Sequence, residues 1–281
     1  MRTATNSDGF DVAYYDLGGD GPPLLFAHAT GFHGHIWQPI AERLAGDFHC
    51  WSFDERGHGD TPAPTDGHFD WNGFARDAMA VIEAEGLVHP FGVGHSGGGA
   101  ALLLAEITRP GTFRALYTYE PIVMPSLDAL PSRREGGNPL AEGARRRREV
   151  FPSRQAAWDN YASKPPMSEW DPAALHAYVD WGFDDLDDGT VRLKCRGENE
   201  ARTYEMATEH GAFPRLAEVT CPVTVAAGET TTTFGPDITE LQARQMAHGR
   251  AEILPGIGHF GPMEDPEEVA DSIRRAFAAA G

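Results

Sequence analysis

The residues from Phe91 to Ala105 constrain the fold of this chain more than any other stretch. An apolar run leads into Gly94-His95-Ser96-Gly97-Gly98, and residues 100–105, rich in alanine and leucine, follow with a strong helical pattern. A Gly-x-Ser-x-Gly sequence between a strand and a helix is typical of a sharp turn that holds the serine in a strained conformation. The turn lifts the serine hydroxyl clear of the sheet, above the positive end of the helix dipole. Ser96 is therefore a candidate nucleophile, and the competing interpretation is a glycine-rich turn with an incidental serine.

Strand and helix patterns alternate on both sides of this turn. The expected strands cover residues 12–16, 24–28, 49–53, 91–95, 115–120, 223–227 and 251–254, and the expected helices include 37–44, 71–86, 237–247 and 266–280. This alternation predicts an α/β fold with a mostly parallel, doubly wound sheet. Such sheets place their sites at the carboxyl ends of the strands.

The alternation breaks between residues 121 and 219. Helical or polar stretches are expected there, over residues 138–150, 153–163, 172–182 and 198–211, and no strand of the sheet type. We interpret residues 121–219 as a helical cap inserted into a core formed by residues 1–120 and 220–281. Six aromatic residues of the cap could line a pocket, although packing onto the core explains most of them: Trp158, Trp170, Tyr178, Trp181, Phe183 and Tyr204. The arginine run at 145–148 could recognise an anion, but a solvated helix face is the favoured interpretation.

Composition narrows the class of partner. Of the 281 residues, 41% are hydrophobic, which is enough for a core, and no segment is long and apolar enough to cross a bilayer. The formal net charge of −19 argues against nucleic acid and anionic membrane surfaces as partners. The three cysteines form no disulfide framework, and no metal ligand set, dinucleotide fingerprint or signal peptide stands out. We expect a cytoplasmic protein without metal or cofactor that acts on a small molecule, and the sequence leaves a homodimer open.

Four separate motifs, in the right order, resemble the α/β-hydrolase family. They are the serine turn, residues 24–32 (Leu-Leu-Phe-Ala-His-Ala-Thr-Gly-Phe), residues 53–61 (Phe-Asp-Glu-Arg-Gly-His-Gly-Asp-Thr) and Gly258-His259-Phe260. The resemblance covers nearly the whole chain and implies a hydrolase with a helical cap. It also implies that His259, in the loop after the last strand, takes the proton of the serine during attack. The loop at 54–60 is interpreted as architectural.

The resemblance further implies the donors of an oxyanion hole. The backbone N–H of Gly97, directly after the nucleophile, should be one of them. The other should be the N–H of Thr30, because His28-Ala29-Thr30-Gly31 is similar to the His-Gly-x motif of the family, with Ala29 in place of glycine. His28 should support this loop, and the side chain of His95 should point away from the serine.

The acid of the catalytic triad is where the sequence departs from the family. The family usually supplies an aspartate after the strand that corresponds to residues 223–227, but Thr231 stands at that position. Glu120 is the preferred alternative, because some relatives, haloalkane dehalogenases among them, draw their acid from the strand after the nucleophile. Glu229, or no carboxylate, remains as the other choice. We predict that the Glu120 carboxylate lies within hydrogen-bond reach of His259, whose other ring nitrogen faces the nucleophile, and that loss of the Thr231 hydroxyl costs little.

These residues predict hydrolysis of a small, fairly apolar carboxylic ester or lactone through an acyl-enzyme intermediate. An amidase, thioesterase or C–C bond hydrolase with the same triad is the alternative among enzymes. A non-catalytic ligand receptor on the same fold is the alternative of another class. Because the nucleophile is serine, aspartate-dependent epoxide hydrolysis and dehalogenation are not expected.

Overall fold

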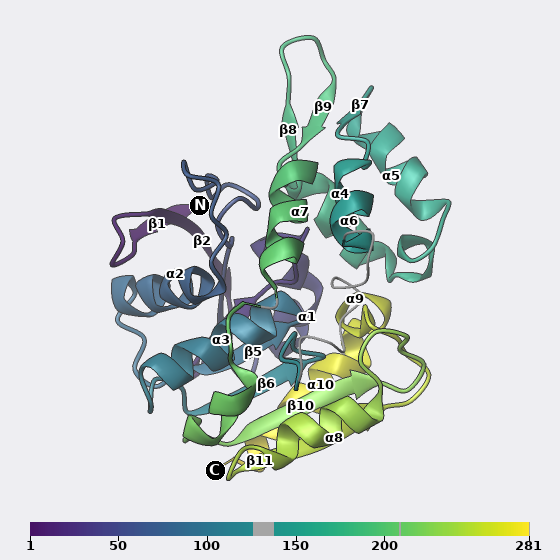
Figure 1. Ribbon diagram of the computed structural model, residues 1–281. Helices are drawn as coiled ribbons and strands as arrows, with labels where there is room; N and C mark the ends of the chain where they lie inside the picture. The colour runs from purple at the N-terminus through teal and green to yellow at the C-terminus, as the bar shows by residue number, and fades with distance from the viewer. Residues whose placement is uncertain (126–137, 208, 281) are drawn as a thin grey trace.

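An eight-stranded sheet forms the centre of the protein in a computed structural model, which describes residues 1–125, 138–207 and 209–280 (Figure 1). Its strands are β1 (Arg2–Thr5), β2 (Asp11–Gly18), β3 (Pro23–Ala27), β4 (His49–Phe53), β5 (Phe91–His95), β6 (Ala115–Tyr119), β10 (Val223–Gly228) and β11 (Gly249–Leu254). They lie in the order β1-β2-β4-β3-β5-β6-β10-β11. The six strands from β4 to β11 in this order are parallel, and β2 runs antiparallel to β1 and β4. The mostly parallel sheet expected from the sequence is confirmed.

Helices cover both faces of the sheet (Figure 1). One face carries α1 (Gln38–Leu44) and α10 (Pro266–Ala278), and the other carries α2 (Trp71–Ala84), α3 (Gly97–Thr108) and α8 (Pro236–Arg244). Side chains that alternate along β3 show how the sheet divides the core, because successive residues of a strand point to opposite faces. Leu24 and Phe26 enter the α1 side, whereas Leu25 and Ala27 enter the α2 side.

The elements between β6 and β10 lie outside the large sheet (Figure 1). They include α4 (Pro139–Arg145), β7 (Val150–Phe151), α5 (Arg154–Ala162), α6 (Pro172–Trp181), β8 (Phe183–Asp185), β9 (Val191–Leu193) and α7 (Gly197–Met206). We call residues 138–207 and 209–219 the inserted segment. Its three strands form a small antiparallel sheet separate from the large one, which the helical or polar stretches expected here did not include. Strands of two or three residues are too short to give a period-two pattern. The division into core and cap at residues 121 and 219 stays a prediction.

The inserted segment shares a hydrophobic core with the α1 side of the sheet. Leu175 and Tyr178 belong to the same buried cluster as Phe32, which follows the end of β3. The Phe32 ring meets the rings of Trp170 and Tyr178 edge-on, with centroids 5.5 and 5.7 Å apart. The inserted segment therefore packs beside the carboxyl end of β3, where a site is expected. Within the described residues, no helix combines the length and the apolarity that crossing a membrane requires.

Candidate active site

The serine turn joins β5 to α3. Ser96 is the N-cap residue of α3 and has φ 53° and ψ −113°, a backbone conformation that residues other than glycine rarely adopt. The glycines around it permit a close packing of backbone on backbone. A Cβ on Gly94 would lie 2.6 Å from the Cα of Gly99, and a Cβ on Gly98 would lie 2.3 Å from the carbonyl oxygen of Ala27. The Gly-x-Ser-x-Gly pattern is thus explained by contacts that leave no room for a side chain.

The end of β6 holds this turn in place. The Ser96 N–H donates to the carbonyl of Tyr119 at 2.9 Å, and the Ser96 carbonyl accepts from the N–H of Ile122 at 3.1 Å. The Ser96 residue is 7% exposed, and its hydroxyl makes no hydrogen bond with the part of the chain that the structure describes. The hydroxyl is therefore available to a base or a substrate. Catalytic hydrogen bonds are often long or absent in unliganded structures.

Glu120 follows β6 directly and is a second non-glycine residue with positive φ, at 43°. Its side chain is fully buried, and its carboxylate accepts three hydrogen bonds. The Gly228 N–H donates to Oε1 at 3.2 Å, the Thr231 hydroxyl donates to Oε2 at 2.8 Å, and His259 Nδ1 donates to the same Oε2 at 2.6 Å. The contact expected between Glu120 and His259 is present.

The Glu229 carboxylate contacts a different part of the chain. Its Oε2 accepts the N–H of Gly256 at 3.0 Å. The structure therefore brings Glu120 to the His259 ring and leaves Glu229 away from it. Thr231, at the place where the family usually has an aspartate, contacts the Glu120 carboxylate rather than the imidazole. The carboxylate on the His259 ring thus comes from the residue after β6, and Thr231 donates a hydrogen bond to it.

His259 lies in the loop between β11 and the short helix α9 (Gly261–Glu264). Two core side chains hold the backbone of this loop: the Tyr119 hydroxyl donates to the Gly258 carbonyl at 2.6 Å, and His95 Nε2 donates to the His259 carbonyl at 2.9 Å. Burial, and then the nearby His259, hold the pKa of His95 well below its usual range, so His95 stays neutral. His95 thus supports the loop instead of acting on Ser96, in line with the orientation expected for it.

The two expected oxyanion donors lie next to each other. The Thr30 nitrogen is 3.6 Å from the position that a Cβ on Gly97 would occupy, and neither N–H has a hydrogen-bond partner within the described ranges. His28 fixes the Thr30 loop: its Nδ1 donates to the Ala29 carbonyl at 2.8 Å, and its Nε2 accepts the Glu55 N–H at 3.0 Å. A negatively charged oxygen between Thr30 and Gly97 would find two unused donors.

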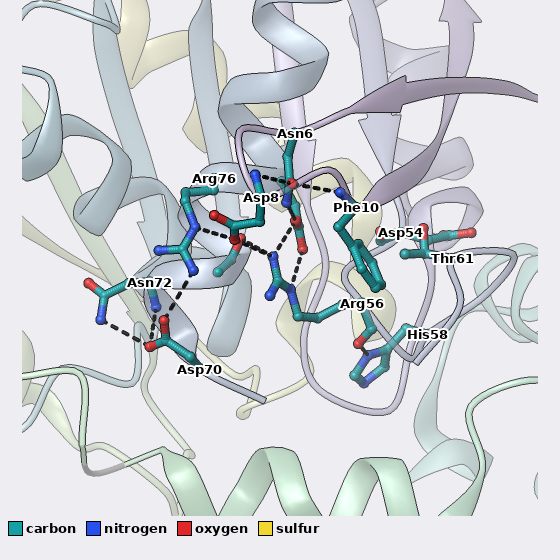
Figure 2. Close-up of polar contacts among 12 residues, drawn as sticks. Asn6, Asp8, Phe10, Asp54, Arg56, His58, Thr61, Asp70, Asn72 and Arg76 are labelled. Atoms are coloured by element: carbon teal, nitrogen blue, oxygen red, sulfur yellow. Dashed lines mark hydrogen bonds and ion pairs between the residues drawn. The ribbon is translucent and has the colours of Figure 1, made fainter. Parts of the chain in front are cut away.

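The loop at 54–60 is part of the architecture. Figure 2 shows its Arg56 side chain within a network of polar contacts near the N-terminal strands. Arg56 donates to both carboxylate oxygens of the buried Asp77, at 2.9 and 2.7 Å, and Asn6 donates to the same carboxylate at 2.7 Å. Asp54 accepts the N–H of Asp60 at 2.7 Å, and burial raises the pKa of its carboxyl to about 6. These residues tie the loop to β1, β2 and α2.

A cavity of about 470 Å³ opens beside Thr30 and extends under the inserted segment. Its apolar wall includes Phe32, Phe151, Met167, Trp170 and Phe260. Gly97, the residue after Ser96, adjoins a lining residue of this cavity, because the Thr30 hydroxyl lies 3.0 Å from the position of a Cβ on Gly97. A second cavity of about 490 Å³ lies along His259, and Phe260 lines both. Both volumes suit a small molecule.

Of the six aromatic residues that could line a pocket, Trp170 and Tyr204 are in the wall of the cavity beside Thr30. Trp158 and Trp181 lie elsewhere: Trp158 stacks on His176, and Trp181 stacks on His35 with ring centroids 3.9 Å apart. Within the described ranges, no three His, Cys, Asp or Glu side chains gather as metal ligands would. A site without metal or cofactor stays a prediction.

Comparison with known proteins adds an independent line of evidence. A family model described as the alpha/beta hydrolase family matches residues 24–272. The non-heme chloroperoxidase of Streptomyces lividans is 33% identical over 136 residues, which are 47% of this chain and 49% of that protein. The bifunctional esterase/perhydrolase of Acinetobacter calcoaceticus is 36% identical over 101 residues, 35% of this chain and 36% of that protein. The chain thus aligns with about half or less of the length of these relatives.

A solved structure extends the similarity over the whole fold. The structure of E-2-(acetamidomethylene)succinate hydrolase superposes with a TM-score of 0.85, covering 99% of this chain and 98% of that one. At 21% sequence identity, this likeness concerns the fold.

Proposed function

We propose that this chain, which belongs to the alpha/beta hydrolase family, is a serine hydrolase that cleaves a small carboxylic ester or lactone with an apolar body through an acyl-enzyme intermediate. The observation that carries the proposal is the hydrogen bond of 2.6 Å between Glu120 and His259 Nδ1, made beside a serine turn with positive φ. A carboxylate on Nδ1 fixes the imidazole tautomer in which Nε2 is free to accept a proton.

The reaction follows the serine hydrolase scheme. Ser96 Oγ attacks the carbonyl carbon while His259 Nε2 takes its proton, and the carbonyl π bond opens to an oxyanion that the N–H groups of Gly97 and Thr30 stabilise. The buried Glu120 carboxylate stabilises the imidazolium that forms. The C–O bond to the leaving alcohol then breaks, and the imidazolium gives that alcohol its proton. Water, deprotonated by His259, releases the acyl group and restores Ser96.

Two features support an ester or lactone with an apolar body. The cavity beside Thr30 has a largely apolar and aromatic wall, which includes Phe32, Trp170 and Phe260, and a volume of about 470 Å³. The Acinetobacter relative, named an esterase/perhydrolase, is 36% identical over the part that aligns. An amide, a thioester or a carbon–carbon bond next to a carbonyl would use the same residues. The strained Ser96 and the buried carboxylate on His259 both cost folding free energy. A ligand receptor would need neither of them.

A fluorophosphonate probe tests the proposal directly. We expect it to label the folded protein on Ser96, as located by mass spectrometry, and we expect the Ser96→Ala variant to stay unlabelled. A panel of five-carbon acyl substrates, with p-nitrophenyl ester, anilide and thioester leaving groups, then ranks the bond types by kcat/KM. Folded protein that is neither labelled nor active on any member of the panel would favour the receptor.

A further inference from the structure

The cavity beside Thr30 has a charge opposite to that of the whole chain. Among its described lining residues, four cationic side chains face a single carboxylate, Glu200; the cations are Arg146, Arg147, Arg148 and Lys164. The chain as a whole has a formal net charge of −19. A concave wall with low-dielectric surroundings concentrates the field of its charges. An anion that the rest of the surface repels is therefore accepted here.

Arg147 is a fixed charge in the wall of this cavity. Its Nη1 donates to Glu200 at 2.5 Å, and its Nη2 donates to the Tyr178 hydroxyl at 2.5 Å. The same Nη1 lies 3.4 Å from the position that a Cβ on Gly31 would occupy, so the guanidinium contacts the loop that carries the Thr30 N–H. The Arg147 side chain is 19% exposed. Glu200 balances most of its charge, so Arg147 orders the wall more than it attracts a ligand.

Lys164 differs from the other three cations of the cavity in having no partner for its charge among the described residues. No hydrogen bond or ion pair joins its ammonium to a residue that the structure describes. The other lysine of the chain, Lys194, donates to Asp60 at 2.6 Å. Arg148 donates to the Val150 carbonyl at 2.8 Å and lies over the Phe151 ring. Lys164 therefore brings to the cavity a positive charge with three unused N–H donors.

These observations point to the chemistry of the ligand. We propose that the substrate carries a carboxylate, which Lys164 binds in the cavity while the carbonyl under attack lies at Thr30. The inference rests on the proposed function and deepens it, because it assigns the two ends of the substrate to two lining residues of one cavity. The apolar body of the substrate would contact Trp170 and Met167 between them. A charge-assisted hydrogen bond to a carboxylate is stronger than a neutral one, so the anionic group would contribute specificity.

A matched pair of substrates tests this assignment. Mono-p-nitrophenyl glutarate and p-nitrophenyl valerate both transfer a five-carbon acyl group, and the first has a terminal carboxylate. We expect wild-type protein to prefer the glutarate ester by kcat/KM. Lys164→Met should lower the ratio of the two kcat/KM values about 10-fold or more, and raising the salt concentration should lower it in the wild type. The control is Arg244→Gln, which removes an exposed cation from α8, outside the cavity, and should leave the ratio within about twofold.

Calorimetric titration with glutarate gives a measurement that does not depend on turnover. We expect wild-type protein to bind glutarate and Lys164→Met to bind it at least about 10-fold more weakly. Equal ratios and equal glutarate affinities in wild type and Lys164→Met would overturn the inference while valerate hydrolysis and Ser96 labelling still stood. Glutarate binding without labelling or hydrolysis would instead reject the hydrolase and keep the anion site.

Discussion

The two sides of the candidate site are built in different ways. On the core side, Ser96 and Glu120 stand at the ends of the adjacent parallel strands β5 and β6, and both have positive φ. Their positions follow from the backbone. On the side of the inserted segment, the cavity wall is made by side chains such as Trp170 and Lys164, which lie on short helices and turns.

The two sides should therefore control different kinetic properties. A non-glycine residue with positive φ costs about 1–3 kcal/mol, so the sheet must hold both residues in place. It does so through the Ser96 N–H on the Tyr119 carbonyl and the Glu120 N–H on the Ala226 carbonyl, at 2.9 and 2.8 Å. The cavity wall is held by side-chain contacts instead, such as that of Arg147 with Glu200. We therefore expect changes in the core to alter kcat, and changes in the inserted segment to alter KM and the choice of substrate.

The largest effect should come from Ser96→Ala. Removal of the nucleophile should lower kcat/KM for a p-nitrophenyl ester by about 10³-fold or more, because the remaining groups have no oxygen to activate. Circular dichroism and thermal melting should show a folded protein, since the Ser96 hydroxyl makes no hydrogen bond with the described chain. Ordinary turnover by this variant would place the chemistry elsewhere.

Glu120→Gln should have the second largest effect, lowering kcat by about 10²- to 10⁴-fold, because an amide neither fixes the His259 tautomer nor stabilises the imidazolium. The matched control is Glu229→Gln, which alters the carboxylate on the Gly256 N–H and should change kcat by less than about threefold. Steady-state kinetics on both variants, with KM measured separately, decides between the two carboxylates. A larger loss in Glu229→Gln than in Glu120→Gln would contradict the assignment.

The core side of the site could be read from the sequence because its determinants are local. The glycines around Ser96 and the Gly-His-Phe stretch at His259 each specify a turn within five residues. The departure at Thr231 was also visible, because the strand before it could be aligned with the family. What no local pattern contains is the contact between Thr231 and Glu120, two residues separated by 111 positions that meet only after β6 pairs with β10.

The wall formed by the inserted segment could not be read in this way. Sequence places Trp158 and Trp181 in expected helical or polar stretches and Trp170 between two of them, but it does not show which of these side chains meets the cavity. Tertiary packing decides that face: Trp170 meets Phe32 and lines the cavity, whereas Trp181 is 45% exposed and stacks on His35. The small sheet β7-β9-β8 could not be predicted from the sequence for the same reason, because its strands are stabilised by pairing and not by their own pattern.

A change in the cavity wall should therefore affect binding. We expect Trp170→Phe to raise KM for p-nitrophenyl esters about 3- to 10-fold and to shift the preferred acyl length, with kcat nearly constant. Phenylalanine is used because alanine at this buried site would cost about 3–5 kcal/mol of stability. Trp181→Phe, on the exposed side, is the control and should leave the chain-length profile unchanged. Loss of fluorophosphonate labelling in folded Trp170→Phe would mean that the inserted segment helps to build the catalytic side.

Thr231 gives the smallest expected effect and the finest test of the comparison. Its hydroxyl oxygen accepts the Thr233 N–H at 3.2 Å, so its hydrogen is directed at Glu120 Oε2, the oxygen that also contacts His259. Sequence alone predicts that loss of this hydroxyl costs little. Because of this contact, we expect Thr231→Val to lower kcat about 3- to 10-fold. The loss is no larger because the Gly228 N–H still holds the other carboxylate oxygen.

Thr231→Ser, which keeps the hydroxyl, should restore kcat to within about twofold of the wild type, while KM stays constant across the series. Restoration by serine but not by valine identifies a positioning residue, because valine matches threonine in shape and lacks the hydroxyl that donates to Glu120 and accepts from Thr233. If valine leaves kcat unchanged, the Gly228 N–H and His259 are enough to orient Glu120, and the backbone alone fixes the core side. If valine costs as much as Glu120→Gln, the core side depends on a side-chain contact as the cavity wall does, and the contrast between the two sides fails.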